Sequence, residues 1–484
     1  MAINTQHPSY VTLLPDWTIM RDTYHGTSAV KAQGQRYLPP TGGMLADGMT
    51  PGAIGAQAYE AYRQRAQFFE FVSEAVRRMV GVLHRKPPSI EVPAGMEDIV
   101  ESATSEDESI HQLLRRVNEA QLVYGRCGLF ADLPAEASTE ADVWLSLYTG
   151  LHILNWEEEE LVVLDESGYV RQADFTWKHE DQYRVLRRNP LSRVYEQALS
   201  RGAGRAVPTD GEYQVPVLRG RSLERLPFVM VNTTDTTYAT GQPPLLGLGH
   251  LSLAVYRGDA DYRQHLHMMG QDTLVIIGAR PSADGTQNTW RTGSGASIEL
   301  DQGGDAKYIG IESAGLQEQR ESLVNDKQLA SNAAGTLIDT RSSQSESGES
   351  RKTRMVAQAT TLTEIAQTGA AAIQEILRVV AKWRGLDPEK VVVQPNLEFG
   401  DENLTGQDMV QMMTARNLGF PISKKSLHGL AQDRGITVMD FEAEMEELAK
   451  EDQEDRARQD AGEAPRGVNN PPPEKDEQDN EDAE

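Results

Sequence analysis

No proline occurs between Pro281 and Pro388, and this absence constrains the fold of the chain more than any other feature of the sequence. Proline breaks a helix interior because it lacks a backbone N–H and its ring clashes with the preceding turn. Within the proline-free stretch, the residues from about Arg351 to Trp383 have a helical pattern. At 1.5 Å per residue, such a helix spans about 50 Å. A helix of this length is typical of a chain that crosses a large assembly or supports a neighbouring subunit.

Apolar residues recur at helical spacing in other segments as well. Pro87 and Pro88 end the longest of these, and Gly125 ends another. The glycine- and proline-rich stretch Tyr37–Gly55 is expected to be a loop. The predicted helices are Asp16–His25, about Ala56–His84, Ser109–Tyr124, Gly249–Met269 and Gly315–Ile338.

Between Arg126 and about Asn232 the pattern changes to short apolar runs separated by turn residues. The runs are Leu161–Leu164, Tyr183–Leu186 and Val215–Leu218. This pattern predicts an antiparallel β region, either one curved sheet or a small sandwich. The chain as a whole is therefore expected to belong to the α+β class.

Later segments are shorter. Thr273–Ile277 is predicted to be a strand, and the polar, glycine-rich Ala283–Gly304 an exposed hairpin. A strand is expected at Lys390–Gln394. Three short helices are expected within Thr405–Lys450, separated by Gly419–Pro421 and Gly435. Residues 451–484 are charged, lack large apolar side chains apart from Val468, and are expected to be disordered.

Several classes of protein do not fit this sequence. No stretch approaches the roughly 20 apolar residues of a membrane span. Residues Met1–Tyr10 have neither a basic start nor an apolar core, so no secretory signal is expected. Cys127 is the single cysteine, which rules out an intrachain disulfide and fits a protein made in a reducing cytoplasm.

The formal net charge is −26, and Phe441–Glu484 contributes 17 acidic and 5 basic residues to it. The rest of the chain is acidic as well. A protein that grips DNA neutralises phosphates with lysine and arginine and is basic where it binds. The composition argues against a tight DNA clamp, although it allows a surface past which DNA slides.

Motifs for enzymatic chemistry are missing from the sequence. No Gly-Lys dipeptide occurs, so there is no Walker A phosphate loop, and there is neither a G-x-S-x-G elbow nor an H-E-x-x-H helix. His265 and His267 stand two apart on a predicted helix, so they point about 200° apart and cannot share a metal ion. The acidic runs Glu157–Glu160 and Glu442–Glu447 are interpreted as solvated faces. Cys127 is interpreted as a small buried hydrophobe, and we expect no enzyme, cofactor or metal.

One local feature favours a function. Ser342–Ser350 contains five serines, and the cations Arg351, Lys352 and Arg354 follow it in the expected first turn of the long helix. Cations there oppose the helix dipole, yet together with free backbone N–H groups they form an anion site. The alternative is that Glu346 and Glu349 offset the cations, or that the helix begins a turn later.

The order of segments resembles the portal proteins of tailed bacteriophages, in a subgroup labelled only as a domain of unknown function. The resemblance covers about residues 10 to 400, and no single motif in it is as specific as a Walker loop. The segments that carry it are Asp16–Asp22, Gln35–Pro39, Tyr59–Pro88, Gly125–Pro134, His152–Trp156, Leu226–Phe228, Pro243–Leu246 and Tyr256–Asp261.

This resemblance implies a portal-type fold whose parts follow one another along the chain. They are a wing of N-terminal helices and antiparallel β structure (1–248), a stem helix (249–270), a small clip (271–314), a second stem helix (315–340), a tunnel loop (341–352), a long wing helix with a strand (353–400), a helical crown (401–450) and an acidic tail (451–484). The tail is unusually acidic for the family.

The resemblance also implies a function. Twelve copies form a ring at one capsid vertex of the virion, through which double-stranded DNA is packaged and ejected. The implied partners are other copies of the chain, the terminase large subunit, the major capsid and scaffolding proteins, and tail adaptor proteins. The implied tunnel-loop residues are Ser342, Ser343, Gln344, Ser345, Ser347, Gly348, Ser350, Arg351, Lys352 and Arg354, and Trp290 and Arg291 in the clip dock the terminase. Two alternatives stay open, namely another phage head or tail component without a channel, and a nucleic-acid enzyme of unrecognised type.

Overall fold

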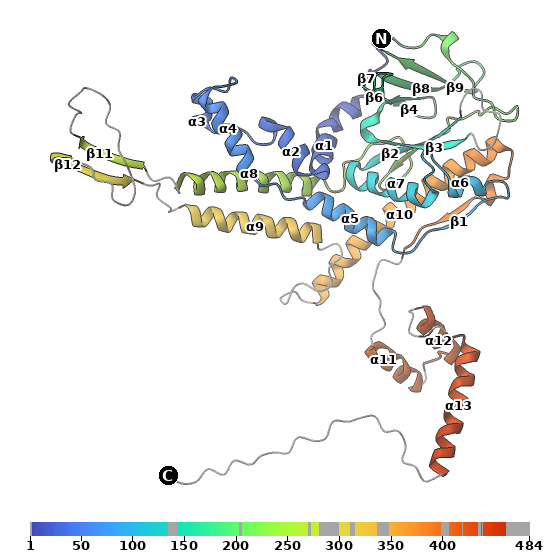
Figure 1. Ribbon diagram of the computed structural model, residues 1–484. Coiled ribbons are helices and arrows are strands. Elements are labelled where there is room, and N and C mark those ends of the chain that lie inside the picture. The colour runs from blue at the N-terminus through green and yellow to red at the C-terminus, as the bar shows by residue number, and fades with distance from the viewer. Residues whose placement is uncertain are drawn as a thin grey trace, which may run out of the picture. The chain divides into compact units, whose positions relative to one another are not determined.

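The computed structural model describes residues 2–133, 143–202, 206–269, 273–279, 300–309, 315–335, 348–397, 406–418, 420–433, 437 and 439–460. The chain divides into two compact units, Met1–Phe399 and Gly400–Glu484. Both contain helices, and the described strands all lie in the first unit (Figure 1). The fold is therefore a mixed α+β fold, as predicted.

The helices of the first unit have these bounds: α1 Pro8–His25, α2 Thr27–Ala32, α3 Gly42–Ala46, α4 Ile54–Arg65, α5 Phe71–Leu83, α6 Glu97–Glu101, α7 Ile110–Tyr124, α8 Leu246–Met269, α9 Leu316–Gly335 and α10 Gly348–Arg384. Short 3-10 turns lie at Gly34–Arg36, Gly150–His152, Asp210–Glu212 and Pro388–Lys390. The predicted helices at Ser109–Tyr124 and Gly249–Met269 are confirmed within a few residues.

The strands pair antiparallel in small separate sheets. They are β1 Ser89–Glu91, β2 Arg126–Asp132, β3 Trp144–Thr149, β4 Ile153–Glu157, β5 Leu161–Asp165, β6 Gly168–Arg171, β7 Trp177–Glu180, β8 Gln182–Arg188, β9 Tyr195–Arg201, β10 Phe228–Asn232, β11 Thr273–Ala279, β12 Leu300–Ile309 and β13 Val392–Gln394. Their orders are β10-β2-β3, β4-β5-β8-β9, β6-β7, β11-β12 and β1-β13. The predicted antiparallel region is confirmed, and its strands form several small sheets.

Local sequence explains α7 well. Ser109 accepts a hydrogen bond from the backbone N–H of Gln112 at 3.4 Å, and the Gln112 side chain accepts one from the backbone N–H of Ser109 at 2.8 Å. This reciprocal capping box satisfies two of the unpaired donors at a helix start. Gly125 ends the helix at φ 70°, a left-handed conformation that glycine adopts without strain. Both ends were predicted because their signals are local.

The core of the first unit is built around α10, which packs against α7, β2 and β10. Ile365, Ile373, Ile376 and Trp383 of α10 are fully buried. At Gly369 the helices approach so closely that an added Cβ would lie 2.5 Å from Nδ2 of Asn118 on α7. The 37-residue length of α10 therefore includes a buried segment and does not serve only as a connection.

The prediction of one continuous helix over Ala56–His84 is wrong. The structure has two helices, α4 and α5, separated at residues 66–70. In a continuous helix the backbone N–H of Gln67 donates to the carbonyl four residues earlier, but here it donates to Oδ2 of Asp259 at 3.0 Å. The side chain of Phe68 is buried beside Tyr256, with the ring centroids 5.9 Å apart. Tertiary contacts with α8 therefore outweigh the helical periodicity.

Four smaller predictions also need correction. The helix expected at Asp16–His25 begins at Pro8 and continues through Pro15. Val215–Leu218 forms no strand, and it contributes only an isolated bridge between Leu218 and Arg221. The stretch Tyr37–Gly55, expected to be a loop throughout, contains the short helix α3. The end of the expected tunnel loop is helical, because α10 already begins at Gly348.

The second unit contains α11 (Gly406–Asn417), α12 (Lys424–Asp433) and α13 (Phe441–Asp460). The three helical segments were predicted, with breaks near Gly419 and Gly435. However, α13 extends ten residues into the segment that was expected to be disordered, and residues 461–484 lie outside the described part. Among the described helices, none is long and apolar enough to cross a bilayer.

The close contact at Gly369 gives a test of the core. We expect Gly369→Ala to lower the free energy of unfolding by about 1–3 kcal/mol, because the new methyl group displaces Asn118 from its hydrogen bonds. The control is Gly81→Ala on α5, where nothing lies within 4 Å of the added Cβ. Alanine there is expected to be neutral or stabilising by up to about 1 kcal/mol. Denaturant unfolding measures both, and equal effects would contradict the packing described.

Candidate functional site: the two-helix stalk and its base

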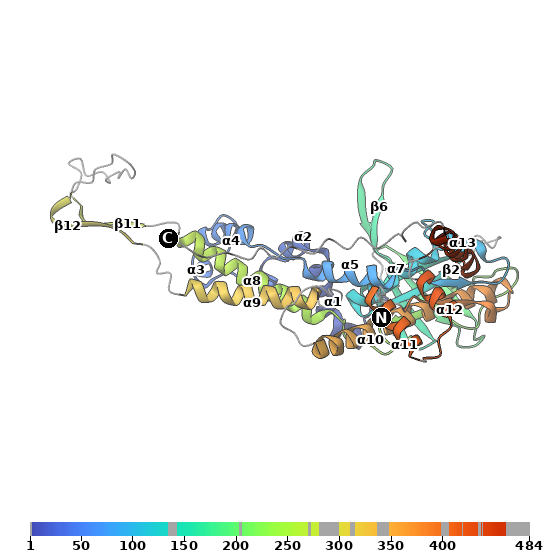
Figure 2. The ribbon, with the colours of Figure 1, turned by 90° about the horizontal axis from the view of Figure 1, so that it is seen from below.

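The helices α8 and α9 form a pair that we call the stalk, and they lie side by side in both ribbon views (Figure 1 and Figure 2). Nδ1 of His265 lies 2.7 Å from Oε1 of Gln319, whereas Nζ of Lys327 donates to Oδ1 of Asp259 at 3.2 Å. Later residues of α8 thus meet earlier residues of α9, so the helices are antiparallel. Their lengths of 24 and 20 residues correspond to about 36 and 30 Å.

The stalk is buried at one end only. The buried residues of α8 lie between Leu248 and Ala260, and its side chains from Arg263 to Met268 are half-buried or exposed. On α9 the buried side chains are those of Leu323, Ala330 and Ala334. The β11–β12 hairpin lies between the two helices in the chain, so it is connected to the ends farthest from the buried base.

Large apolar side chains remain exposed along both stalk helices. They are Leu266, Met268, Val324 and Leu329. Single exposed apolar residues are common on proteins. These four face different sides of the stalk, because Leu266 and Met268 are two positions apart on α8 and Val324 and Leu329 five positions apart on α9. The stalk by itself lacks a partner for these side chains within the described chain.

Asp259 holds the base of the stalk together. Its carboxylate is buried and accepts from Nε of Arg263 at 2.6 Å, from Nζ of Lys327 at 3.2 Å and from the backbone N–H of Gln67 at 3.0 Å. Nζ of Lys327 also lies 4.1 Å from the centroid of the Phe69 ring. One carboxylate therefore joins α8, α9 and the break between α4 and α5.

Two further contacts attach α4 to α8. The hydroxyl of Tyr62 donates to Oδ1 of Asp261 at 2.5 Å, and Nη2 of Arg65 donates to Oε1 of Gln264 at 2.5 Å. Burial and the neighbouring carboxylate raise the pKa of Tyr62, so the hydroxyl stays protonated as the donor. The direction of the stalk is thus fixed by hydrogen bonds on two sides.

Sequence reasoning missed Asp259. The signal was present, because an aspartate lies between Tyr256 and Ala260 on the apolar side of a predicted helix, four residues before Arg263. A buried carboxylate requires paired donors. The sequence alone did not reveal that α9 and residues 66–70 supply the others.

Most of the residues predicted from sequence for the channel and the clip lie outside the described part of the chain. Trp290 and Arg291 lie outside the described residues, as do Ser342, Ser343, Gln344, Ser345 and Ser347. Gly348, Ser350, Arg351, Lys352 and Arg354 belong to the first two turns of α10 by their backbone. The tunnel-loop and clip assignments therefore stay predictions.

Two side chains that were considered for catalysis, those of Cys127 and Glu160, are buried or paired in the structure. Cys127 is buried, and burial raises the pKa of its thiol well above the ordinary value. Glu160 pairs with Arg188 and with Arg193, the latter at 2.8 Å. Within the described part of the chain, no three His, Cys, Asp or Glu side chains form a group suited to a metal ion.

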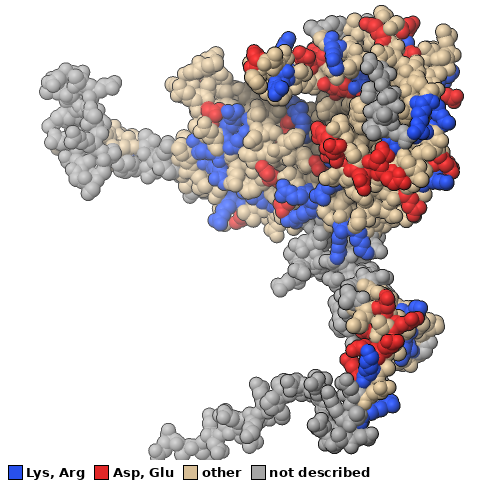
Figure 3. Space-filling view, turned by 45° about the vertical axis from the view of Figure 1, so that its right-hand side comes forward, with Lys and Arg blue, Asp and Glu red and all other residues tan. Residues whose placement is uncertain are grey.

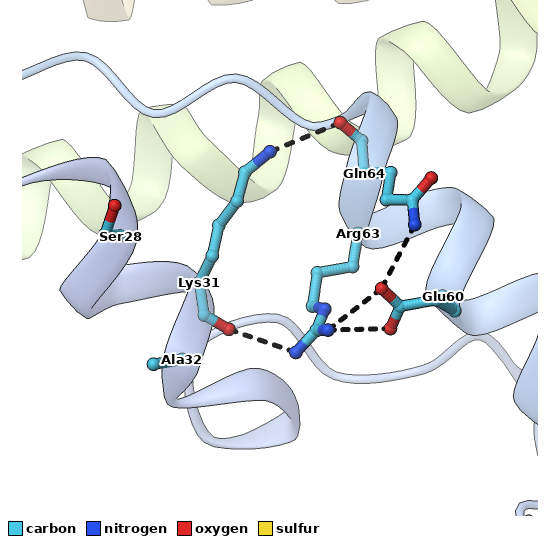
Figure 4. A pocket seen from close by; sticks show the side chains of 6 residues that line it. All are labelled: Ser28, Lys31, Ala32, Glu60, Arg63 and Gln64. Carbon is cyan, nitrogen blue, oxygen red and sulfur yellow. Dashed lines mark hydrogen bonds and ion pairs between the residues drawn. The ribbon is translucent and has the colours of Figure 1, made fainter.

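A shallow pocket of about 270 Å³ lies between α2 and α4 (Figure 4). Its charged groups pair with one another. Nη2 of Arg63 lies 2.7 Å from Oε2 of Glu60, Nη1 of Arg63 donates to the carbonyl of Lys31 at 3.2 Å, and Nζ of Lys31 donates to the carbonyl of Gln64 at 3.2 Å. These bonds join the two helices, which is a structural task.

Charge on the surface is mixed. On the face seen in Figure 3, lysine and arginine side chains are interspersed with aspartate and glutamate, and they form no continuous basic band among the described residues. DNA binding of high affinity depends on such a band of cations.

Comparisons with known proteins give a partial family match. Residues 244–384 match the family model described as "Domain of unknown function (DUF4055)", which spans less than a third of the chain. No curated protein matches the sequence.

Among solved structures, the chain is similar to chains from the virion of a native gene transfer agent (GTA) particle, from the neck of the native particle computed with C12 symmetry and from the neck of the empty particle computed with C6 symmetry. Their sequence identities are 12%, 13% and 14%, and the TM-scores are 0.39, 0.38 and 0.38. Each match covers 74% of this chain and 89% of the other.

The base of the stalk gives a second test. Asp259→Asn leaves Arg263 and Lys327 without their carboxylate, and we expect a loss of about 1–3 kcal/mol in stability. Amide hydrogen exchange in α8 and α9 is expected to quicken relative to α7. The control Glu318→Gln removes an exposed carboxylate from α9, so its effect is expected to be smaller. If both variants exchange alike, Asp259 does not hold the base.

Proposed function

We propose that this chain is the subunit of a phage portal, a ring at one capsid vertex through which double-stranded DNA is packaged and ejected. The observation that carries the proposal is the path of the chain from Leu246 to Arg384. It runs through α8, a two-stranded hairpin, α9 and then the long α10. This order of elements supports the portal proposal. It is the same order as the stem helix, clip, second stem helix and long wing helix of the family that the sequence resembles.

The exposed apolar side chains of the stalk support a ring. In a closed ring each stalk has a neighbour on both sides, so the exposed side chains of α8 and α9 pack between copies. Association of identical chains through two different surfaces yields rings when the rotation closes. A stalk whose direction is fixed at its base, by Asp259, suits such an arrangement because every copy must present the same faces.

Charge supports a channel rather than a clamp. The chain carries a net charge of −26, and each phosphate contact in a channel must break as DNA advances. An acidic subunit with few fixed cations toward DNA meets this requirement. The proposed contact is confined to the segment 341–352, where serines precede Arg351 and Lys352 at the start of α10.

The remaining assignments are part of the same proposal. The segment 271–314, with Trp290 and Arg291, acts as a clip that docks the terminase large subunit and later tail adaptor proteins. Residues 401–450 form a crown, and 1–248 with 353–400 form a wing that contacts capsid and scaffolding proteins. Measuring the ring stoichiometry separates the portal proposal from a head or tail component without a channel. ATPase and nuclease assays separate it from a nucleic-acid enzyme.

The first expected result is that the purified protein forms closed rings with a central hole in negative-stain images. Val324→Glu combined with Leu329→Glu is expected to raise the concentration needed for assembly at least tenfold, because charged groups then enter the contact between stalks. The control is Leu418→Glu, an exposed leucine of the second unit. Light scattering that finds only the 53.5 kDa monomer at all concentrations and salts would contradict the proposal.

The second expected result concerns the channel. Deleting residues 343–347 leaves α10 intact, and we expect rings to form while DNA packaging or retention fails. Arg351→Glu with Lys352→Glu is expected to slow packaging by repelling phosphate, with a smaller defect at higher salt because exposed charges are screened beyond about 8–10 Å.

The matched control for the charge reversal is Lys424→Glu with Lys425→Glu on α12, where both side chains are exposed. It should package at the normal rate. If the deletion and the Arg351 and Lys352 reversal also package and retain full-length DNA normally, the segment does not line the channel.

A further inference from the structure

The strands β6 and β7 form a hairpin that projects from the sheets of the first unit, and Figure 2 shows it standing clear of its neighbours. The two strands pair only with each other among the described strands. They continue the β5–β8 pair outward, because the backbone N–H of Glu166 donates to the carbonyl of Gln182 at 2.9 Å. A two-stranded ribbon alone is at best marginally stable in water.

The base of the hairpin is nevertheless held firmly. Glu166 accepts from the Tyr148 hydroxyl at 2.7 Å, from Nε2 of Gln182 at 2.7 Å and from Nε of Arg184 at 2.6 Å. Burial alone raises the pKa of Glu166, but the charge of Arg184 and these hydrogen bonds lower it overall. The hairpin therefore leaves the unit from a rigid charged base.

One face of the hairpin is aromatic and exposed. Tyr169 pairs with His179 and Arg171 with Trp177, so these four side chains share a face. The exposed fractions are 71% for Tyr169, 64% for Trp177 and 76% for Phe175 at the tip. The guanidinium of Arg171 lies 5.6 Å from the Phe175 ring centroid, which places the tip on the same side.

Phe175 is also in an unfavourable backbone conformation. Its φ is 66°, which a bulky residue rarely adopts and glycine adopts freely. The turn is fixed around it, because Oδ1 of Asp174 accepts from the backbone N–H of Thr176 at 3.1 Å and from its hydroxyl at 2.6 Å. Neither the exposure of Phe175 nor its strained backbone stabilises a single copy of the chain. Backbone strain of this kind is often kept where a residue has a function.

The same unit carries a pocket of about 350 Å³ that is lined by both apolar and polar residues. Its apolar residues include Phe228 and Met230 of β10, and its charged residues are the exposed Glu158 and Glu159 and the ion-paired Arg225 and Glu375. This volume falls in the range of pockets that bind organic groups. The lining holds three carboxylates and one arginine, so its net negative charge complements an aromatic face that carries Arg171.

We propose that the β6–β7 hairpin of one copy inserts Phe175 and Trp177 into this pocket of a second copy, with Arg171 against Glu158 and Glu159. This contact deepens the proposed function, because it is one junction between neighbouring subunits of the ring. It joins two different surfaces, so it propagates from copy to copy until the ring closes. Buried aromatic residues dominate the energetics of such junctions.

The areas support a second copy as the occupant. The two inserted aromatic side chains, at about 150–250 Å² each, supply roughly 300–500 Å². A stable protein interface uses about 800 Å² on each partner. The hairpin thus supplies about half of one junction, and the exposed stalk side chains add to it.

Site-specific cross-linking tests the contact directly. Cys127 is the only cysteine and is buried, so introduced cysteines react selectively. The full chain with Phe175→Cys and Thr236→Cys, the latter on the pocket lining, is treated with a short flexible bismaleimide. We expect a ladder of covalent multimers on denaturing gels, and no ladder from either single variant.

The other outcomes overturn the inference. Efficient dimers from Phe175→Cys alone mean that two hairpins meet each other, and a cross-link within one chain means that the hairpin folds back. Absence of cross-links in preparations that contain rings refutes this contact and leaves the proposed function standing. A protein that stays monomeric at all concentrations refutes both.

A second arm uses Phe175→Gly, which removes the side chain and relieves the backbone strain, so folding is preserved. We expect a melting temperature at or above that of the natural chain, together with at least a tenfold rise in the concentration needed for assembly. The matched control is Leu191→Ser, an exposed leucine (94%) in the turn between β8 and β9, which should assemble normally.

Charge reversal completes the test. Arg171→Glu is expected to weaken assembly, and adding Glu159→Arg to the same chain is expected to restore it. Assembly of Phe175→Gly at the natural concentration, or the absence of rescue by Glu159→Arg, would count against the hairpin.

Discussion

The contact of α10 with α7 at Gly369 is the constraint on which the rest of the first unit depends. Asn118 and Gln121 of α7 bond to each other at 2.9 Å, and Nδ2 of Asn118 also reaches the carbonyl of Ile365 at 3.3 Å. Nε2 of Gln121 donates to the carbonyl of Asn232 at the end of β10. Two buried amides therefore connect α7, α10 and the three-stranded sheet, which is possible only because residue 369 has no side chain.

The C-terminal end of α10 is fixed as well. Nη1 and Nη2 of Arg384 donate to the two carboxylate oxygens of Asp98, each at 2.7 Å, at the C-terminal end of α10. The hydrogen bonds from Arg384 lower the pKa of Asp98 below its usual value. With its last turns and its middle fixed, α10 points its N-terminal turns in a set direction. The segment that connects it to the stalk begins there.

The buried charges of this protein orient the elements that they join more than they stabilise the fold. Replacing a buried ion pair by apolar groups is often neutral or stabilising, whereas removing one partner is costly. Asp259 at the base of the stalk and the cluster of Arg184, Asp132 and Glu166 under the β6–β7 hairpin follow this logic. Both lie where an element leaves the body, and both hold that element against rotation. Burial raises the pKa of Asp132 even though Arg184 lies at 3.1 Å.

The sequence by itself determined the elements whose signals are local. Ser109, Gln112 and Gly125 specify the ends of α7, the proline-free stretch permits the length of α10, and short apolar runs bounded by turn residues specify β5 and β8. Tertiary structure decided what depends on distant partners. The break at Gln67 requires Asp259 from a helix nearly 200 positions later. The failure of Val215–Leu218 to form a strand is different, because Pro216 within it has no backbone N–H to donate to a neighbouring strand and was a local signal. Periodicity shows which face of a segment is apolar, but it does not show what that face meets. A carboxylate or an amide that is satisfied only by remote donors is therefore apparent only once the chain has folded.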